Sequence, residues 1–186
     1  MSKNLPNILT VSRVILIPVM LIFFYLPVEW NRIAASFIFG LAGMTDFLDG
    51  YFARKHKTFS KFGAFLDPVA DKLTVTTALI ILLQDHPTIL MMIATAVIVG
   101  RELTISALRE WMADLGERTT VNVAFVGKIK TVFQMFAIGF LLFEHDLWGI
   151  PVFTIGLSLL YIATALTLWS MFIYLKAAWP MMKEKI

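Results

Sequence analysis

Long runs of apolar residues, separated by short polar segments, set the pattern of this sequence. A transmembrane helix needs about 20 mostly apolar residues, whereas the strands of a membrane β-barrel show shorter alternating segments. Runs of the first kind occur at residues 5–26, 33–54, 62–83, 89–112, 121–143 and 150–178. The pattern predicts an all-α protein in which six transmembrane helices form one bundle, a single domain over residues 1–186. The first run lacks a small-residue cleavage site, and we expect it to be retained as a helix.

Lysine and arginine are unevenly distributed among the connections between these runs. Three connections contain neither residue: 26–31, 84–88 and 144–149. The other polar segments are rich in them: 54–61, 109–130 and 176–185. Short loops that carry Lys and Arg stay on the cytoplasmic side of a membrane. Both chain termini, and the helix ends that flank 54–61, are therefore predicted to be cytoplasmic.

The composition agrees with a membrane protein. Apolar residues make up 59% of the chain, charged residues 16%, and the mean hydropathy is +0.79, values outside the usual range of soluble domains. The net charge of +3 and the pI near 9.2 suit anionic lipid or phosphate, and no nucleic-acid partner is expected. The same basic residues also fit a simpler role as anchors at the membrane surface. The absence of cysteine excludes disulfides and thiolate metal sites.

Four aspartates lie close together, at the charged ends of the second and third runs. Asp46 and Asp49 are three residues apart, and Asp67 and Asp71 are four apart, so each pair projects from one face of its helix. The basic connection between the two runs turns the chain back, which makes these helix ends antiparallel neighbours. All four carboxylates are therefore predicted to meet near the cytoplasmic surface.

Four carboxylates in surroundings of low dielectric constant repel one another and need a compensating cation. Oxygen ligands without histidine or cysteine favour Mg²⁺ or Mn²⁺, and a site of this kind holds one or two ions that bind phosphoryl oxygens. Alternatively, the aspartates form buried ion pairs with Arg54, Lys72 and Arg101. Gly50, beside Asp49, indicates either close approach of a ligand to the backbone or close packing of helices.

The aspartates belong to a longer pattern that also includes glycine, alanine and arginine. Its members, in order, are Asp46, Asp49, Gly50, Ala53, Arg54, Gly63, Asp67 and Asp71. This spacing matches the signature of the CDP-alcohol phosphotransferase family without departure. Further segments that begin at Asn7, Phe62 and Gly100 resemble the bacterial members that use glycerol 3-phosphate. The likeness covers nearly the whole chain.

The resemblance implies a six-helix, usually homodimeric enzyme that converts CDP-diacylglycerol and sn-glycerol 3-phosphate into phosphatidylglycerophosphate and CMP. It implies a place among the lipids of a bacterial inner membrane, with the active site facing the cytoplasm. Asp46, Asp49 and Asp67 would be ligands of Mg²⁺ or Mn²⁺. Asp71 would complete the metal cluster and act as the base on the acceptor hydroxyl.

The resemblance also implies a pocket for the cytidine diphosphate part of CDP-diacylglycerol. Its candidate residues are Asn7, Thr10, Gly50, Arg54, Ser60 and Gly63. Without the resemblance, Asn7 and Thr10 would be interpreted as helix-capping residues and Ser60 as a turn residue.

An acceptor that carries its own phosphate needs fixed cations in addition to the metal. Candidates near the predicted cytoplasmic ends of the fourth and fifth helices are Arg101, Arg109, Arg118, Lys128 and Lys130. Arg101 and Arg109 are eight residues apart, about two turns along one side of a helix. Alternatively, Arg101 pairs with an aspartate or with Glu102, and the two lysines anchor their helix at the membrane interface.

Other functions fit parts of the sequence. The same chemistry with inositol phosphate, serine or an amino alcohol as acceptor would use the same aspartate pattern. A cation transporter would also place carboxylates within a membrane, but transporters favour midplane sites on broken helices in repeated halves, and no repeat is visible here. Direct in-line displacement of CMP is the simplest route, although a carboxylate can also act as a covalent nucleophile.

Overall fold

The structure is a computed structural model that describes most of the chain. It covers the backbone of residues 5–56, 61–114 and 124–185 and, within these, the side chains of residues 10–46, 65–112 and 129–179. The regular secondary structure of this part is entirely helical, apart from an isolated β-bridge between Leu147 and Ile150. The predicted all-α class is confirmed for the described residues.

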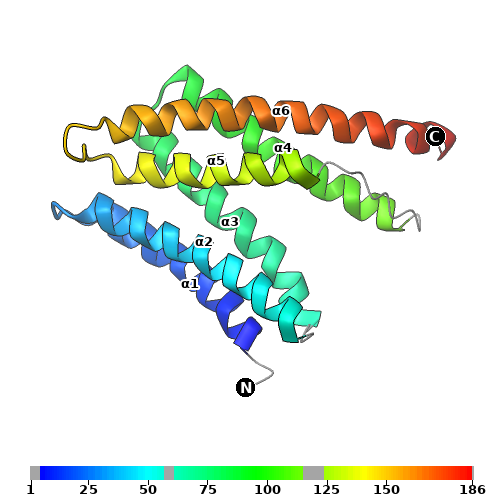
Figure 1. The fold of residues 1–186 in the computed structure, drawn as a ribbon, viewed down its shortest axis with the longest axis horizontal. Coiled ribbons are helices and arrows are strands. Elements are labelled where there is room, and N and C mark those ends of the chain that lie inside the picture. The colour runs from blue at the N-terminus through cyan, green and yellow to red at the C-terminus, as the bar shows by residue number, and fades with distance from the viewer. Residues whose placement is uncertain (1–4, 57–60, 115–123, 186) are drawn as a thin grey trace.

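The helices follow the apolar runs of the sequence. In the described part of the chain they are α1 (Leu5–Tyr25), α2 (Asn31–His56), α3 (Lys61–Asp85), α4 (Ile89–Asp114), α5 (Ala124–Phe143) and α6 (Val152–Lys185). Successive helices run in opposite directions, so the two ends of the chain lie toward the same side of the bundle (Figure 1). The largest departure from the predicted boundaries is in α6, which continues past 178 to Lys185.

Apolar length and outward-facing side chains indicate a helical membrane protein. Stretches long and apolar enough to cross a membrane lie at Ile89–Met112 and Val152–Trp179, and shorter apolar stretches lie at Thr10–Tyr25 and Ile129–Phe143. Large apolar side chains also point outward from the bundle, as Phe37 does with 67% of its surface exposed. In water such a surface would be costly, whereas lipid accepts it.

The helices form two pairs with α3 crossing between them. α1 packs along α2, α5 packs along α6, and α3 contacts both pairs, while α4 packs against α6 and α3 (Figure 1). Gly156 of α6 allows the second pair to approach closely, because a Cβ atom there would lie 3.0 Å from Cγ of Leu141. The buried core between the pairs consists of small and aliphatic residues, among them Met20, Ala78, Leu79, Leu82, Ile98, Ile138 and Leu142.

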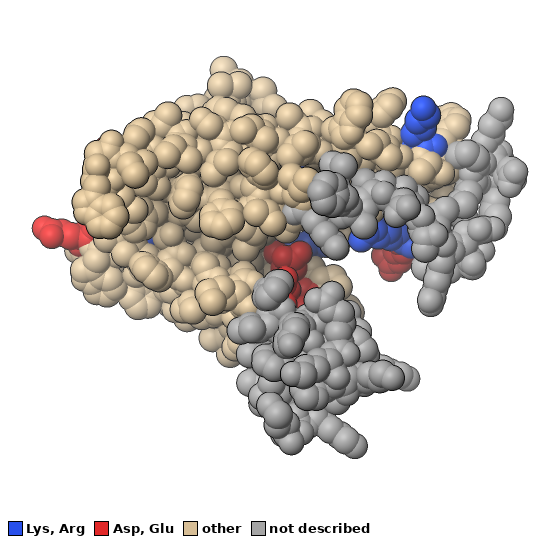
Figure 2. Space-filling model, viewed as in Figure 1, with Lys and Arg blue, Asp and Glu red and all other residues tan. Residues whose placement is uncertain are grey.

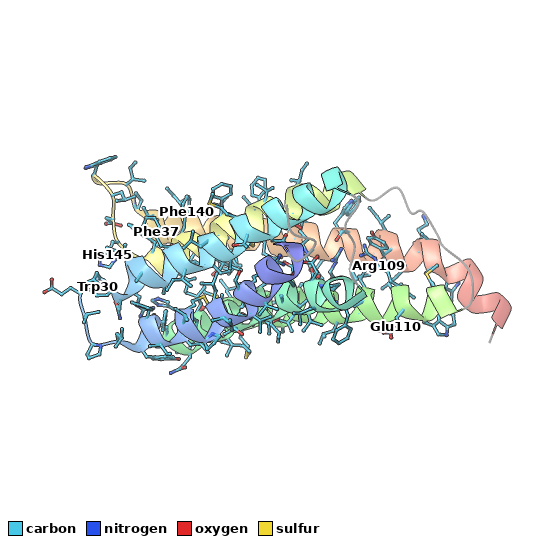
Figure 3. The ribbon with its side chains drawn as sticks, turned by 90° about the horizontal axis from the view of Figure 1, so that it is seen from below. Trp30, Phe37, Arg109, Glu110, Phe140 and His145 are labelled. Carbon is cyan, nitrogen blue, oxygen red and sulfur yellow. The ribbon has the colours of Figure 1, made fainter. Side chains whose placement is uncertain are left out.

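The two pairs separate toward the side of the chain termini and stay together at the opposite side (Figure 1). At the closed side, Arg32 of α2 donates a hydrogen bond to Asp85 at 2.5 Å and lies 3.3 Å from Glu144. His86 completes this group, which we call the outer ion cluster, at 3.2 Å from Asp85 and 3.4 Å from Glu144. Trp30 and His145 lie at the same end, remote from Arg109 (Figure 3). The cluster therefore fastens the ends of α2, α3 and α5 to one another.

The carboxylates and imidazole of the outer ion cluster have the geometry of a metal site. Ligand atoms of Asp85, His86 and Glu144 lie within 4.8 Å of one another. However, Arg32 already places its positive charge between the two carboxylates. Arg32 thus supplies the positive charge that a bound metal ion would otherwise supply to these carboxylates.

We predict that Arg32→Met lowers the free energy of unfolding by roughly 1–3 kcal/mol, because two partly buried carboxylates lose their charged partner. The measurement is the thermal unfolding of the purified protein in detergent. Asp146→Asn is the matched control, since Asp146 is exposed near the same end and has no ion pair among the described residues. Equal melting temperatures for the two variants would contradict a fastening role for Arg32.

Candidate active site

Three of the four predicted aspartates meet where the helix pairs separate. Asp46 lies late in α2, and Asp67 and Asp71 lie in the first half of α3. Asp46 and Asp71 line a cavity of about 640 Å³, which also contains Arg13 of α1. Figure 2 shows acidic and basic side chains gathered at this point on an otherwise mostly neutral face. The predicted convergence of the two helix ends is thus present in the described residues.

Arg13 is the centre of this group. Its Nη1 atom donates hydrogen bonds to Oδ1 of Asp46 at 2.7 Å and to Oδ1 of Asp67 at 2.9 Å. The side chain of Arg13 is 1% exposed, whereas those of Asp46 and Asp67 are 45% and 50% exposed. The guanidinium therefore lies on the buried side of the site, and the two carboxylates that it binds remain accessible to a ligand.

Arg13 was not among the residues that sequence reasoning selected. A signal was present, because a charged residue inside an apolar helix needs a partner and marks a polar site. Arg13 also lies three residues after Thr10, so both belong to one face of α1. Thr10 is likewise buried, with 1% of its surface exposed. The sequence does not reveal how α1 crosses α2 and α3, and this crossing determines which residues contact this face of α1.

Asp71 differs from the other two aspartates. It is exposed, and no ion pair joins it to another of the described side chains. The neighbouring Lys72 donates a hydrogen bond to Oγ of Ser106. The ion-pair alternative therefore applies to Asp46 and Asp67, but through Arg13 and not through Lys72.

Several predicted site residues lie outside the described side chains. For Asn7, Asp49, Gly50, Arg54, Gly63 and Lys128 the structure describes only a place in a helix, and Ser60 and Arg118 lie wholly outside the described residues. Asn7 is on α1, one turn before Thr10, and Asp49, Gly50 and Arg54 continue α2 beyond Asp46. Their roles stay predictions.

Arg101 and Lys130 share a single carboxylate. Oε1 of Glu102 accepts hydrogen bonds from Nη1 of Arg101 at 3.0 Å and from Nζ of Lys130 at 2.5 Å. Both cations are buried, with 8% and 3% of their surfaces exposed. The predicted alternative of an Arg101–Glu102 ion pair is therefore observed. For Lys130, a buried ion pair replaces the expected snorkelling contact, and its pairing with Glu102 was not foreseen.

Arg109 lies farther along α4 and is exposed. Its Nη2 atom donates a hydrogen bond of 2.9 Å to the hydroxyl of Tyr174 on α6, and its guanidinium lies 5.4 Å from the centre of that ring. The guanidinium of Arg101 lies 5.8 Å from the centre of the same ring. Tyr174 thus links the two arginines that the sequence placed on one side of the fourth helix.

The donor set at Arg13 fits a divalent cation. Arg13 binds one oxygen of Asp46 and one of Asp67 from the buried side, both carboxylates stay about half exposed, and Asp71 supplies a further carboxylate at the same cavity. Oxygen donors without sulfur or imidazole are the ligands that Mg²⁺ and Mn²⁺ prefer. Asp46, Asp67 and Asp71 are therefore donors of the type that such an ion takes, whereas the described group whose ligand atoms all lie within 4.8 Å of one another is the outer ion cluster.

Comparison with known proteins identifies the same relationship along the whole chain. A family model described as CDP-alcohol phosphatidyltransferase matches residues 3–172. A protein of Escherichia coli (strain K12), named CDP-diacylglycerol–glycerol-3-phosphate 3-phosphatidyltransferase, is 46% identical over 178 residues, which is 96% of this chain and 96% of that protein. A protein of the same name from Shigella flexneri serotype 5b (strain 8401) has the same identity and coverage.

We predict that Glu102→Gln costs roughly 3–5 kcal/mol of stability, because it leaves Arg101 and Lys130 buried without their anion. Thermal unfolding in detergent measures the loss. Glu110→Gln, an exposed change on the same helix, should leave the melting temperature unchanged. The double variant Glu102→Gln/Lys130→Met should recover part of the loss, since one unpaired cation is removed. A Glu102→Gln variant as stable as Glu110→Gln would show that the shared ion pair has no structural role.

Proposed function

The chain belongs to the CDP-alcohol phosphatidyltransferase family, and we propose that it transfers the phosphatidyl group of CDP-diacylglycerol to sn-glycerol 3-phosphate. The products are phosphatidylglycerophosphate and CMP. The observation that carries the proposal is the meeting of Asp46 and Asp67 on one buried cation, beside a cavity that Asp71 also lines. The names of the relatives, at 46% identity over 96% of the chain, support the donor and the acceptor.

The aspartates would hold the divalent metal, Mg²⁺ or Mn²⁺, as one or two ions. When bound, such an ion neutralises the pyrophosphate of the liponucleotide and the negative charge that grows on the departing CMP. Arg13, on the buried side of the site, holds Asp46 and Asp67 next to each other. Because both carboxylates are about half exposed, they stay accessible from the cavity.

Asp71 would accept the proton of the acceptor hydroxyl. In this step the hydroxyl oxygen attacks the phosphorus that bears the diacylglycerol, the bond from that phosphorus to the CMP oxygen breaks, and the proton passes to the carboxylate of Asp71. Asp46 and Asp67 are less suited to this task, because Arg13 holds an oxygen of each. Direct displacement then needs no covalent phosphatidyl-enzyme.

The phosphate of the acceptor needs a cation that is not already neutralised. Arg101 and Lys130 share Glu102 and are buried, so they contribute mainly to the local positive potential. Arg109 is exposed and is held by a neutral partner, Tyr174. Its charge is therefore available for the phosphate of sn-glycerol 3-phosphate, and Arg109 is our first candidate for that role, with Arg118 and Lys128 as further candidates.

The proposed reaction also requires a defined place in a membrane. We propose that all six helices span it, with both termini and the aspartates on the cytoplasmic side. The alternating helix directions support this arrangement (Figure 1), as does the distribution of lysine and arginine. A bacterial inner membrane and a homodimer follow from the family resemblance.

We predict that the purified protein releases CMP from CDP-diacylglycerol only when both sn-glycerol 3-phosphate and Mg²⁺ or Mn²⁺ are present. Asp71→Asn should lower the rate by roughly 10²–10⁴-fold, the usual contribution of a general base. Chromatographic quantification of CMP measures both results. Asp146→Asn, a change of the same kind in the exposed connection between α5 and α6, should keep full activity.

Replacement of the acceptor by inositol phosphate or serine separates the alternatives. Turnover with one of these, and none with sn-glycerol 3-phosphate, would keep the chemistry and overturn the acceptor. No CMP release with any acceptor would overturn the enzymatic proposal and return attention to cation transport.

We predict that Arg109→Gln raises KM for sn-glycerol 3-phosphate by about tenfold or more, because a charge-assisted hydrogen bond to the phosphate is lost. The KM for CDP-diacylglycerol should stay unchanged. Lys176→Gln is the control for general loss of positive charge, since Lys176 is an exposed cation of α6. Tyr174→Phe keeps the charge of Arg109 but removes its anchor, and should give an intermediate KM. An unchanged acceptor KM in Arg109→Gln would exclude this residue from the phosphate site.

A further inference from the structure

The cavity beside the aspartates extends away from the proposed nucleotide residues. Its lining comes from α2, α3 and α5 and includes Ala42, Gly43, Met44, Thr74, Val75, Thr131, Val132, Met135 and Phe136. On α2 these residues precede Asp46, and on α3 they follow Asp71. Gly50 and Arg54, the candidates for the cytidine diphosphate, lie beyond Asp46 in the opposite direction along α2. From the aspartates, the cavity therefore runs toward the middle of the helices.

The chemistry of this lining excludes a polar ligand over most of its length. Among the described lining residues, the charged groups are Arg13, Asp46 and Asp71, all at one end. The remainder consists of aliphatic, thioether and aromatic side chains with two threonines. Met44 and Phe136 at the rim are 63% and 57% exposed, so the cavity opens on the apolar surface of the bundle. A ligand that matches it has a charged head at the aspartates and a hydrocarbon tail.

We propose that this cavity receives one acyl chain of CDP-diacylglycerol and that Gly43 and Met135 set the width it offers to that chain. The proposal rests on the function proposed above. The continuity of the cavity with the aspartates selects the occupant, because the phosphorus that bears the diacylglycerol must lie at Asp46 and Asp71 during transfer. The acyl chains then lead away from that point, and the bilayer is the only apolar destination.

Met135 packs against Gly43, and both residues line the cavity. A Cβ atom built on Gly43 would lie 2.5 Å from Cε of Met135, so the absence of a side chain at residue 43 leaves room for the methionine. Gly43 is three residues before Asp46, about 4.5 Å along the helix axis. The narrow part of the cavity at Gly43 and Met135 therefore lies beside the first carbons of the acyl chain, where a methyl branch would meet the cavity wall. Met135 is flexible and can adapt its shape to a ligand.

Gly40 provides a matched control on the same helix. It lies one turn before Gly43, and a Cβ atom built there has no neighbour within 4 Å. A side chain added at residue 40 therefore introduces the same change in helix propensity and apolarity without entering the cavity. Any effect confined to Gly43→Leu must come from the cavity.

The experiment is a competition between CDP-dipalmitoylglycerol and CDP-diphytanoylglycerol in the same detergent micelles, with mass spectrometry of the two products. The two chains have equal backbone length, but the phytanoyl chain carries methyl branches. The product ratio gives the relative kcat/KM for the two donors and does not depend on the amount of folded enzyme. A variant that merely folds less well leaves this ratio unchanged.

We predict that Met135→Ala raises the preference for the branched chain by roughly tenfold, the scale on which a pocket discriminates a methylene group. Gly43→Leu should lower that preference. The double variant Gly43→Leu/Met135→Ala should return toward the wild-type product ratio, because the volume added at residue 43 is removed at residue 135. Gly40→Leu should keep the wild-type ratio.

Identical ratios in all of these variants would overturn the acyl-chain cavity while leaving the enzyme's function intact. A shift in Gly40→Leu as large as that in Gly43→Leu would likewise overturn it, since that residue lies outside the cavity. Failure of the wild-type protein to form either product would instead mean that the proposed function is wrong.

Discussion

The electrostatic cost of bringing carboxylates together inside an apolar bundle governs this structure. Asp46 and Asp67 come from two helices, and each would repel the other in surroundings of low dielectric constant. Arg13 removes that repulsion by donating to both from a buried position on α1. One side chain thereby ties three helices at the point where the two pairs separate. The two ion pairs of Arg13 hold parts of α1, α2 and α3 together there.

Charged side chains gather at separate places along the bundle, and each place contains both signs of charge. The outer ion cluster closes one end around Arg32, and Glu102 pairs with both Arg101 and Lys130 elsewhere in the bundle. Between them the bundle is apolar, and the cavity beside the aspartates is apolar as well. A lipid nucleotide has the same division into a charged head and a hydrocarbon tail. The distribution of charge over the fold thus matches the form of the proposed donor.

Local periodicity is enough to predict the helices and the proximity of the aspartates, because both depend on residues a few positions apart. The apolar runs end close to the ends of the observed helices, and α3, which begins at Lys61 soon after α2 ends at His56, contacts α2. Arg13 could not be assigned in this way, since its partners lie 33 and 54 residues away. The contact of Glu102 with Lys130 was similarly overlooked, because it depends on how the fourth and fifth helices meet. Partners across helix crossings are set by packing angles, which a single sequence does not contain.

The central claim is that the aspartates of α2 and α3 form a divalent cation site, and Mn²⁺ binding tests it without any substrate. Electron paramagnetic resonance of Mn²⁺ titrated into the purified protein separates free from bound ion. The account predicts saturable binding in the wild type, a loss of that binding in Asp67→Asn, and unchanged binding in Asp85→Asn, which alters the outer ion cluster instead. Binding that survives Asp67→Asn and disappears in Asp85→Asn would place the metal at the wrong end of the bundle and contradict the account.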